Sequence, residues 1–442
     1  MTLCRFSLCA VLALSAVVVR AEATYTLETF EKKAVTELFY AEGAAIGDFN
    51  HDGKMDIVSG PFWYEGPDFT VKHQYFEDAL SKSFDKNAYS KNFFAFAFDI
   101  NGDGWDDIII LGFPGEDASW YENPKGKDGP WVRHKVAPVV DNESPTFVDI
   151  TGDGKPEIVC SMSTDEVTDQ KDKDGKPVKK HVGYMGYYEA DWKDPAKPWT
   201  FHKISAPGGW GRFTHGLGVG DVNGDGKMDI LAHEGWWEQP ADLSKDEPWK
   251  FHKANFGDGG SQMHVYDVNG DGVNDVVCSV QAHGWGLAWF EGKKGADGEL
   301  TFTKHLIMGQ KPEENKYGIK FSQMHAVELA DMDGDGVKDI VTGKRHWAHG
   351  SHGDPEPLGP AVLYWFKTVR NADKTVDFTP YQIDNDSGVG TQLTVGDIYG
   401  NKLPDILVGN KRGTFVFKHV RKTVTKEEWE AAQPKPSVPP AK

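Results

Sequence analysis

The stretch from Asp221 to Asp229, which reads Asp-Val-Asn-Gly-Asp-Gly-Lys-Met-Asp, decides how this chain folds. It places oxygen-bearing side chains at positions one, three, five and nine of a loop, and Gly226 at position six, where the backbone must turn sharply. A hard cation with several oxygen ligands requires this arrangement, and the position-seven carbonyl of Lys227 would add a further ligand. We therefore expect calcium in this acidic loop.

The acidic loop recurs along the chain. Further copies begin at Asp48, Asp99, Asp149, Asp267 and Asp331. In a seventh copy, at Asp397, Tyr399 and Asn401 stand at positions three and five and Lys402 replaces the glycine, so we expect no calcium there. The expected calcium ligands of the six intact loops are Asp48, Asn50, Asp52, Asp56, Asp99, Asn101, Asp103, Asp107, Asp149, Thr151, Asp153, Glu157, Asp221, Asn223, Asp225, Asp229, Asp267, Asn269, Asp271, Asp275, Asp331, Asp333, Asp335 and Asp339.

Each acidic loop lies within the same succession of apolar runs. A β-prone run enters the loop, a short apolar run leaves it, an aromatic run follows and a fourth run closes the unit. Four short strands at this spacing are typical of a propeller and not of a helical solenoid. The last unit lacks a fourth run, but Phe30 to Val35 resembles the fourth run at Phe201 to Ile204. The sequence predicts an all-β, seven-bladed β-propeller with four-stranded blades, the last one closed by the N-terminal strand.

Length and composition support one exported domain. A closed repeat array absorbs the 442 residues as a single unit, which we place at 24–423. Residues 1–23 have an early Arg5, an apolar run and small residues at Ala21 and Ala23, which is typical of a secretory signal peptide. We therefore expect a secreted or periplasmic protein, cut after Ala21 or Ala23. The Pro-rich residues 424–442 are predicted to be a disordered tail.

Charge, hydropathy and cysteine content limit the partners that this chain can have. The formal net charge of −19 argues against nucleic acid. Beyond the leader, no apolar run is long enough to span a membrane. Cys160 and Cys278 occupy equivalent positions in units that are not neighbours, so we expect both to be buried free thiols. We expect a monomer.

The six acidic loops, in phase with short strands, resemble the FG-GAP or VCBS repeats of integrin-like seven-bladed propellers. The resemblance covers the whole chain after the leader. It implies the propeller fold and calcium binding. It implies little about activity, because that family includes adhesion modules, lectin-like proteins and enzymes.

Histidines of units four, five and six lie at the strand ends away from the acidic loops, an end that we call the mouth. One set opens the first strands, at His215, His264 and His325. Because the acidic loop joins the first strand to the second, the ends of the second strands also belong at the mouth, and a second set follows them: His233, His283 and His346. His215 and His325 precede their loops by six residues, whereas His264 precedes its loop by three.

Two interpretations of these histidines remain open. The first set would suit zinc or another divalent transition-type metal, in addition to calcium. The alternative is that the histidines are ordinary hydrogen-bonded surface residues. Cationic and aromatic residues near the mouth fit a carbohydrate or an anionic ligand. The candidate catalytic residues are His233, His283, His346, Tyr317 and Arg345.

Short motifs in units five and six, Ala282 to Gly284, Thr303 to His305 and the pair Met324-His325, are similar to the propeller part of fungal aldos-2-ulose dehydratases. That likeness implies metal-assisted elimination on a keto-sugar. Polysaccharide lyases built on seven-bladed propellers would use a similar mouth, with His and Tyr as acid and base and Arg neutralising a uronate. No nucleophile elbow, phosphate loop or dinucleotide fingerprint stands in a strand-turn-helix context.

We therefore predict a carbohydrate-active, divalent-metal-assisted lyase or dehydratase. The alternative is a non-catalytic propeller of the adhesion or lectin-like type, which binds carbohydrate or protein. The two differ in the metal: only the enzyme needs a transition-type ion at the mouth.

Overall fold

The computed structural model describes residues 24–76, 83–127, 129–171, 173–245 and 247–437. Within them the chain forms 28 strands and two short α-helices, α1 (Gly350–Gly353) and α2 (Lys426–Ala432), so the fold is all-β as predicted. The predicted signal peptide, residues 1–23, lies outside the described residues. Among those described, no helix is long and apolar enough to cross a membrane.

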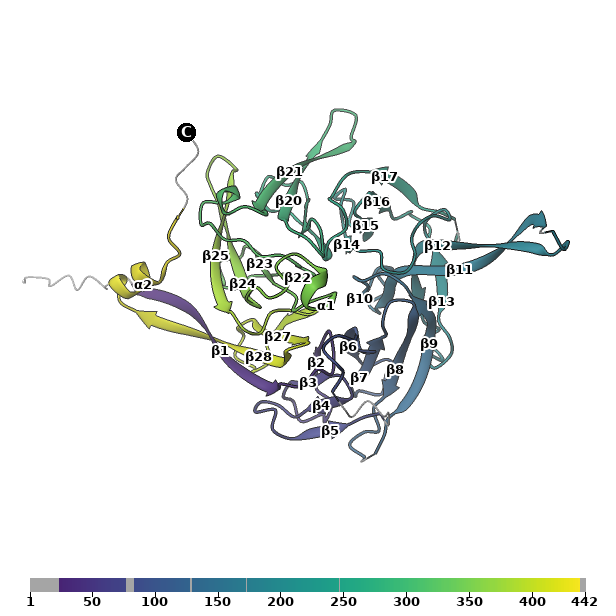
Figure 1. Cartoon of the computed structure of the whole chain (residues 1–442), viewed down its shortest axis with the longest axis horizontal. Helices are drawn as coiled ribbons and strands as arrows, with labels where there is room; N and C mark the ends of the chain where they lie inside the picture. Colours follow the sequence, from purple (N-terminus) through teal and green to yellow (C-terminus); the bar gives the residue numbers. More distant parts are fainter. Residues whose placement is uncertain (1–23, 77–82, 128, 172, 246, 438–442) are drawn as a thin grey trace, which may run out of the picture.

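The strands form antiparallel four-strand units in chain order. The first three units are β2 (Ala45–Gly47), β3 (Asp56–Ser59), β4 (Phe62–Tyr64) and β5 (Lys72–Gln74); β6 (Phe94–Phe98), β7 (Asp107–Leu111), β8 (Glu116–Glu122) and β9 (Val132–Val140); and β10 (Thr146–Val148), β11 (Glu157–Lys171), β12 (Pro177–Glu189) and β13 (Thr200–Lys203). The ends of β11 and β12 continue as a hairpin that projects from the molecule (Figure 1).

The next units are β14 (Leu217–Gly220), β15 (Asp229–Ala232), β16 (Gly235–Glu238) and β17 (Lys250–Lys253); β18 (Gln262–Tyr266), β19 (Asp275–Ser279), β20 (Leu287–Lys294) and β21 (Leu300–Met308); and β22 (Val327–Ala330), β23 (Asp339–Gly343), β24 (Leu363–Arg370) and β25 (Val376–Asp384). The final sheet contains β26 (Leu393–Gly396), β27 (Asp405–Asn410), β28 (Gly413–Val424) and the N-terminal β1 (Tyr25–Thr36).

The first and last strands of the chain pair with each other. β1 lies antiparallel to β28, from Tyr25 opposite Val424 to Thr36 opposite Thr414. The N-terminal strand thus completes the last sheet, as the match between Phe30 to Val35 and a fourth strand predicts. The observed strand is longer than the predicted one at its N-terminal end.

Two neighbouring units are not separate sheets, which differs from the prediction of discrete blades. β14 pairs in parallel with β18, so that these units share one eight-stranded sheet. Glycines on β14 explain the close approach. A Cβ on Gly218 would lie 2.2 Å from the Met263 carbonyl oxygen, and one on Gly220 would lie 2.6 Å from Cβ of Val265. Only a strand without side chains at these positions can come within hydrogen-bonding distance of its neighbour.

The hydrophobic core lies between neighbouring sheets. Alternate residues of each second strand point to opposite sides, because side chains of a strand alternate between its two faces. In the first sheet, Val58 packs with Ile108 of the next one, while Ile57 packs with Leu407 of the last. Equivalent clusters join the remaining neighbours in turn. The sheets accordingly surround a common centre in Figure 1, with β2, β6, β10, β14 and β22 nearest to it.

The rings of the third strands are structural in at least five sheets. Trp63 stacks on His73 with centroids 4.1 Å apart, and Nε2 of His73 lies 2.7 Å from Glu65. Four other sheets repeat this stack of an aromatic ring on a fourth-strand histidine that pairs with a glutamate. Cys160 and Cys278 are buried free thiols, as predicted.

The prediction of a disordered tail is wrong for residues 424–437, which pack against the sheets. Thr425 caps α2 by accepting a hydrogen bond from the Glu428 backbone N–H, and the Glu428 side chain bonds back to the cap. The Trp429 ring lies 5.6 Å from that of Tyr25 on β1. The sequence did not reveal this packing because it depends on a tertiary contact, and Tyr25 lies at the other end of the sequence from Trp429.

Candidate metal site at the mouth

The strand registers separate the acidic loops from the mouth. In the fourth unit, Gly220 lies opposite Asp229 and Leu217 lies opposite Ala232. The loop from Asp221 to Asp229 therefore closes one end of this strand pair. His215, before β14, and His233, after β15, lie at the other end, as the sequence predicts.

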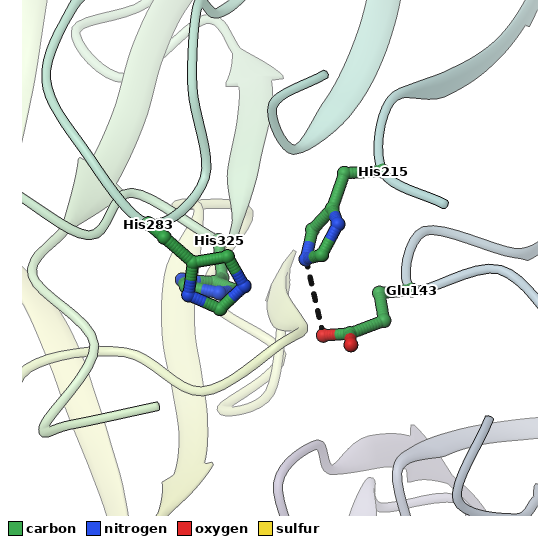
Figure 2. A group of neighbouring side chains, drawn as sticks. All are labelled: Glu143, His215, His283 and His325. Carbon is green, nitrogen blue, oxygen red and sulfur yellow. Dashed lines mark ion pairs between the residues drawn. The ribbon is translucent and has the colours of Figure 1, made fainter. Parts of the chain in front are cut away.

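Four side chains from four sequence-distant segments meet at the mouth (Figure 2). Glu143 precedes β10, His215 precedes β14, His283 follows β19 and His325 precedes β22. One ligand atom from each lies within 4.8 Å of the others, which is close enough for one metal ion to reach all four. The imidazole centroids are 4.8 Å apart for His215 and His283, and 4.6 Å apart for His283 and His325.

Burial favours the neutral form of two of the three imidazoles, His325 and His283. His325 is 1% exposed, and burial, helped by the cationic Arg345, holds its pKa well below the usual range. Its Nδ1 lies 3.3 Å from the Gln323 carbonyl, an acceptor only, so Nδ1 carries the proton. Its Nε2 has no hydrogen-bond partner among the described residues and keeps a free lone pair. Burial also lowers the pKa of His283.

Glu143 supplies negative charge to the cluster. Burial alone would raise its pKa, but the hydrogen bond and charge of His215 and the charge of Arg345 lower it, so the side chain is a carboxylate. Nε2 of His215 lies 3.2 Å from Oε2 of Glu143. Arg345, 1% exposed, lies 3.1 Å from Glu42 and 3.8 Å from Glu143. This arginine therefore holds two buried carboxylates in place.

A second group adjoins the cluster and shares His283 with it. Asp354 accepts hydrogen bonds from the backbone N–H of His349, at 2.8 Å, and from Nδ1 of His349, at 2.9 Å. Nδ1 of His283 lies 3.4 Å from the same carboxylate. Burial alone would raise the pKa of Asp354, but His283 and His349 lower it well below its usual range. The side chain of His349 is 52% exposed and that of His283 is 30% exposed, so these two face the solvent side.

The structure does not bring every predicted residue to this site. Nε2 of His264 lies 2.7 Å from the Val327 carbonyl, and His264 is not part of the cluster. Its spacing of three residues before Asp267, instead of six, displaces it along β18. The prediction that His264 is a ligand is thus not supported by its position, and His283, predicted as catalytic, stands in its place.

The other predicted catalytic residues lie outside the cluster. His233 approaches Glu234, at 3.7 Å, and lines a separate hollow with Lys253 and Asn255. His346 packs against Trp347, with centroids 4.4 Å apart.

Tyr317 lies elsewhere again. Its hydroxyl is 3.2 Å from Oγ1 of Thr379, in a groove that is also lined by Trp429 of α2. None of the four clustered residues lines this groove. The position of Tyr317 therefore gives it no acid or base role at the cluster.

Sequence reasoning missed Glu143, Glu42 and Asp354. A signal for the first two exists: the residue six positions before each acidic loop enters the mouth. Reading that position in all seven units gives Glu42, Phe93, Glu143, His215, Ser261, His325 and Thr391. Glu42 and Glu143 were missed because only histidines were considered at this position. Asp354 has no such signal, because it lies in an insertion between β23 and β24.

The acidic loops are closed by hydrogen bonds of their own. Oδ1 and Oδ2 of Asp221 accept the backbone N–H groups of Asp225 and Gly226. Asp229, at position nine, accepts the N–H groups of Val222 and Gln239. Burial raises its pKa to about 6. Position nine is therefore a buried anchor of the turn, while positions one, three and five face outward.

One loop brings its predicted ligands together. Asp331, Asp333 and Asp335 each offer an oxygen within 4.8 Å of the others. The Lys367 ammonium pairs with both Asp333 and Asp335, so a cation already balances part of this charge. Such clustered carboxylates repel one another unless positive charge lies between them.

The decayed loop keeps the same turn. Asp397 accepts the backbone N–H groups of Asn401 and Lys402, as Asp221 does at the equivalent positions. Asp405 accepts that of Ile398. The turn therefore forms without the complete ligand pattern.

The chain contains FG-GAP-like repeats, since the model of that repeat matches residues 99–160 and 267–342. None of the curated proteins compared with the sequence matches it. Among solved structures, rhamnogalacturonan lyase YesW is similar at 12% identity and a TM-score of 0.39, over 89% of this chain and 72% of that one. An auxiliary nutrient binding protein from Bacteroides ovatus has 8% identity and a TM-score of 0.39, over 84% of each chain.

A third similar structure is the biofilm matrix protein Bap1 of V. cholerae. It has 10% identity and a TM-score of 0.35, over 88% of this chain and 81% of that one. At such TM-scores, none of the three similarities defines a shared function.

Proposed function

We propose that this protein is an exported, calcium-stabilised, seven-bladed β-propeller whose mouth holds one divalent transition-type metal and catalyses an elimination on a sugar, as a lyase or dehydratase. The observation that carries the proposal is the convergence of Glu143, His215, His283 and His325. Three nitrogens and one carboxylate form a donor set that suits zinc.

The propeller part of the proposal rests on packing. Seven hydrophobic clusters link neighbouring four-strand units, and the series returns from the last unit to the first through Leu407 and Ile57. The calcium part rests on the six intact acidic loops, whose positions one, three and five carry oxygen ligands on the outside of each turn. Calcium would neutralise carboxylates that otherwise repel.

The residues at the mouth fit a metal. Nε2 of His325 is buried and lacks a hydrogen-bond partner in the part of the chain that the structure describes, which is costly unless a ligand occupies it. The Glu143 carboxylate is kept charged beside it. These residues would hold a divalent ion, which would supply Lewis acidity toward a sugar carbonyl.

The chain's own residues define the rest of the chemistry. A polyhydroxylated substrate approaches past His283 and His349, the two more exposed imidazoles. His349 is the residue placed to take the proton next to the carbonyl, because its Nδ1 is engaged by Asp354 and its ring lies at the solvent side. Arg345 keeps Glu143 in position and does not reach the substrate, since it is buried.

Metal binding to the chelator-treated full-length protein tests this proposal. We expect about one tightly held zinc or cobalt ion per chain beyond calcium, which is lost in His215→Ala and kept in the control His352→Ala, whose side chain is exposed. The metal-loaded protein should release an unsaturated product, detected by its ultraviolet absorption, from keto-sugars or uronate-containing polysaccharides. Absence of a tight ion in the wild-type protein would overturn the proposal.

A binding module without catalysis is the second candidate. The burial of Glu143 and His325 favours it, because two of the four ligands are remote from solvent. In that case carbohydrate binding survives in His215→Ala, and no unsaturated product forms with either protein. Binding and product assays on the same two proteins separate the candidates.

A further inference from the structure

The insertion between β23 and β24 brings a buried carboxylate against the metal cluster. Asp354 has a side chain that is 3% exposed, although it lies in an irregular segment that follows α1. Besides accepting two hydrogen bonds from His349, its carboxylate lies 3.4 Å from Nδ1 of His283. A buried charge outside the four ligands needs a role, because burial of a charge is costly.

The insertion is fixed to the segment that carries His325. The Ser322 hydroxyl donates to the Pro355 carbonyl at 2.7 Å, and the Ala348 backbone N–H donates to the Gln323 side chain at 3.1 Å. The carboxylate of Asp354 is also held by the His349 backbone. Its position is therefore set by the fold and does not depend on what occupies the cluster.

Asp354 can determine which ring nitrogen of His283 carries the proton. Its Nδ1 has no satisfied hydrogen bond, and the Asp354 oxygen at 3.4 Å is the acceptor within reach among the described residues. Such contacts are often long in a ligand-free site and shorten on loading. The ring is also stacked on His349, with centroids 4.4 Å apart, which limits its rotation.

We propose that Asp354 is a positioning residue that holds the Nδ1–H tautomer of His283, so that Nε2 presents its lone pair to the metal. This inference rests on the proposed metal site. A histidine ligand commonly donates its second N–H to a carboxylate, which orients the ring and makes the coordinating nitrogen more basic. The insertion thus serves the site without contributing a ligand.

The variant Asp354→Asn keeps the shape of the side chain and removes its charge. We expect zinc and cobalt affinity to fall by about 10- to 100-fold, measured by competition with a chromophoric chelator. The visible spectrum of the cobalt-loaded protein should also change, because the coordination of His283 is altered. The matched control is Glu356→Gln, in the same insertion, which pairs with Lys320 and not with the cluster. It should match the wild type in both measurements.

The background variant His283→Ala separates positioning from general support of the fold. There, adding Asp354→Asn should weaken cobalt binding no further, since its effect acts through the missing imidazole. An additional loss in that background, or unchanged affinity in the single variant, overturns the role of Asp354. If wild type binds no metal, the proposed function fails. If wild type binds metal and His215→Ala does not, while Asp354→Asn equals wild type, only the positioning role fails.

Discussion

The loop end and the mouth of the sheets follow different rules. At the loop end, the first aspartate of each turn accepts backbone N–H groups of the same turn, so the turn at Asp397 keeps these hydrogen bonds of the turn at Asp221 despite a changed sequence. At the mouth, the residue six positions before the loop is a glutamate in two units, a histidine in two others and Phe93 in a fifth. Repetition persists where a unit must satisfy its own backbone, and it is lost where units meet one another.

Calcium removal should give the largest effect. If calcium lies in the intact loops, each site loses about 2.7 kcal/mol when calcium at 100 times its dissociation constant is withdrawn. The calorimetric unfolding temperature should fall sharply with a calcium chelator. Asp221→Asn should reduce this dependence, and the matched Asp397→Asn should leave it unchanged, although both side chains accept the same two backbone N–H groups. If the chelator leaves the unfolding temperature unchanged, the protein is not stabilised by calcium and that part of the proposal is wrong.

His346, at the mouth, should give a smaller effect that depends on pH. Burial, with the nearby charges of Arg412, Lys86, Lys344 and Lys411, lowers its pKa from 6.5 to about 4. Between these pH values the unfolded chain binds a proton that the folded one does not, so the free energy of unfolding decreases as pH falls from 6.5 to about 4. After discounting for solvent screening, we expect about 1 to 2 kcal/mol.

Denaturant unfolding of wild type and His346→Gln across this pH range measures the difference. Subtracting the variant removes the contribution of the buried loop carboxylates, which titrate nearby. His352→Gln, at an exposed position of the same insertion, is the control. Parallel curves for wild type and His346→Gln would mean that His346 is not buried in its neutral form.

The smallest change in stability should come from substitutions at position six of the turns, where the intact loop has glycine and the decayed loop has Lys402. Lys402 has a φ of 63°, where Gly226 has 86° in the intact loop. A side chain in this left-handed region is strained, so Lys402→Gly should stabilise the protein by about 0.5 kcal/mol and Gly226→Ala should destabilise it by about 1 kcal/mol. Chemical denaturation measures both. Calcium dependence should stay unchanged in Lys402→Gly, because Tyr399 still replaces a ligand.

The fold was largely predictable because its signal is local and repeated. Each acidic loop predicts one antiparallel strand pair, and the copies set the order of the units. The features that were missed are contacts between distant residues. Gly218 permits the parallel pairing of β14 with β18, and Trp429 contacts Tyr25, which lies near the other end of the chain. Neither contact leaves a pattern within a short stretch.

The site was predictable only in part, for the same reason. His215 and His325 follow from their spacing of six residues before a loop. His264 was grouped with them although it precedes its loop by three residues, and this distance from the loop decides its place. Asp354 was out of reach, because an insertion has no counterpart in the other units from which its position could be inferred.

The pairing of β1 with β28 also bears on synthesis. β1 leaves the ribosome among the first described residues, and its partner is among the last. Through almost the whole of translation its 12 residues have no strand to bind, and unpaired strand edges invite association with other chains. The slow step of folding should then be the late capture of this strand, so a chain cut short before Gly413 would leave both of its edge strands exposed to aggregation.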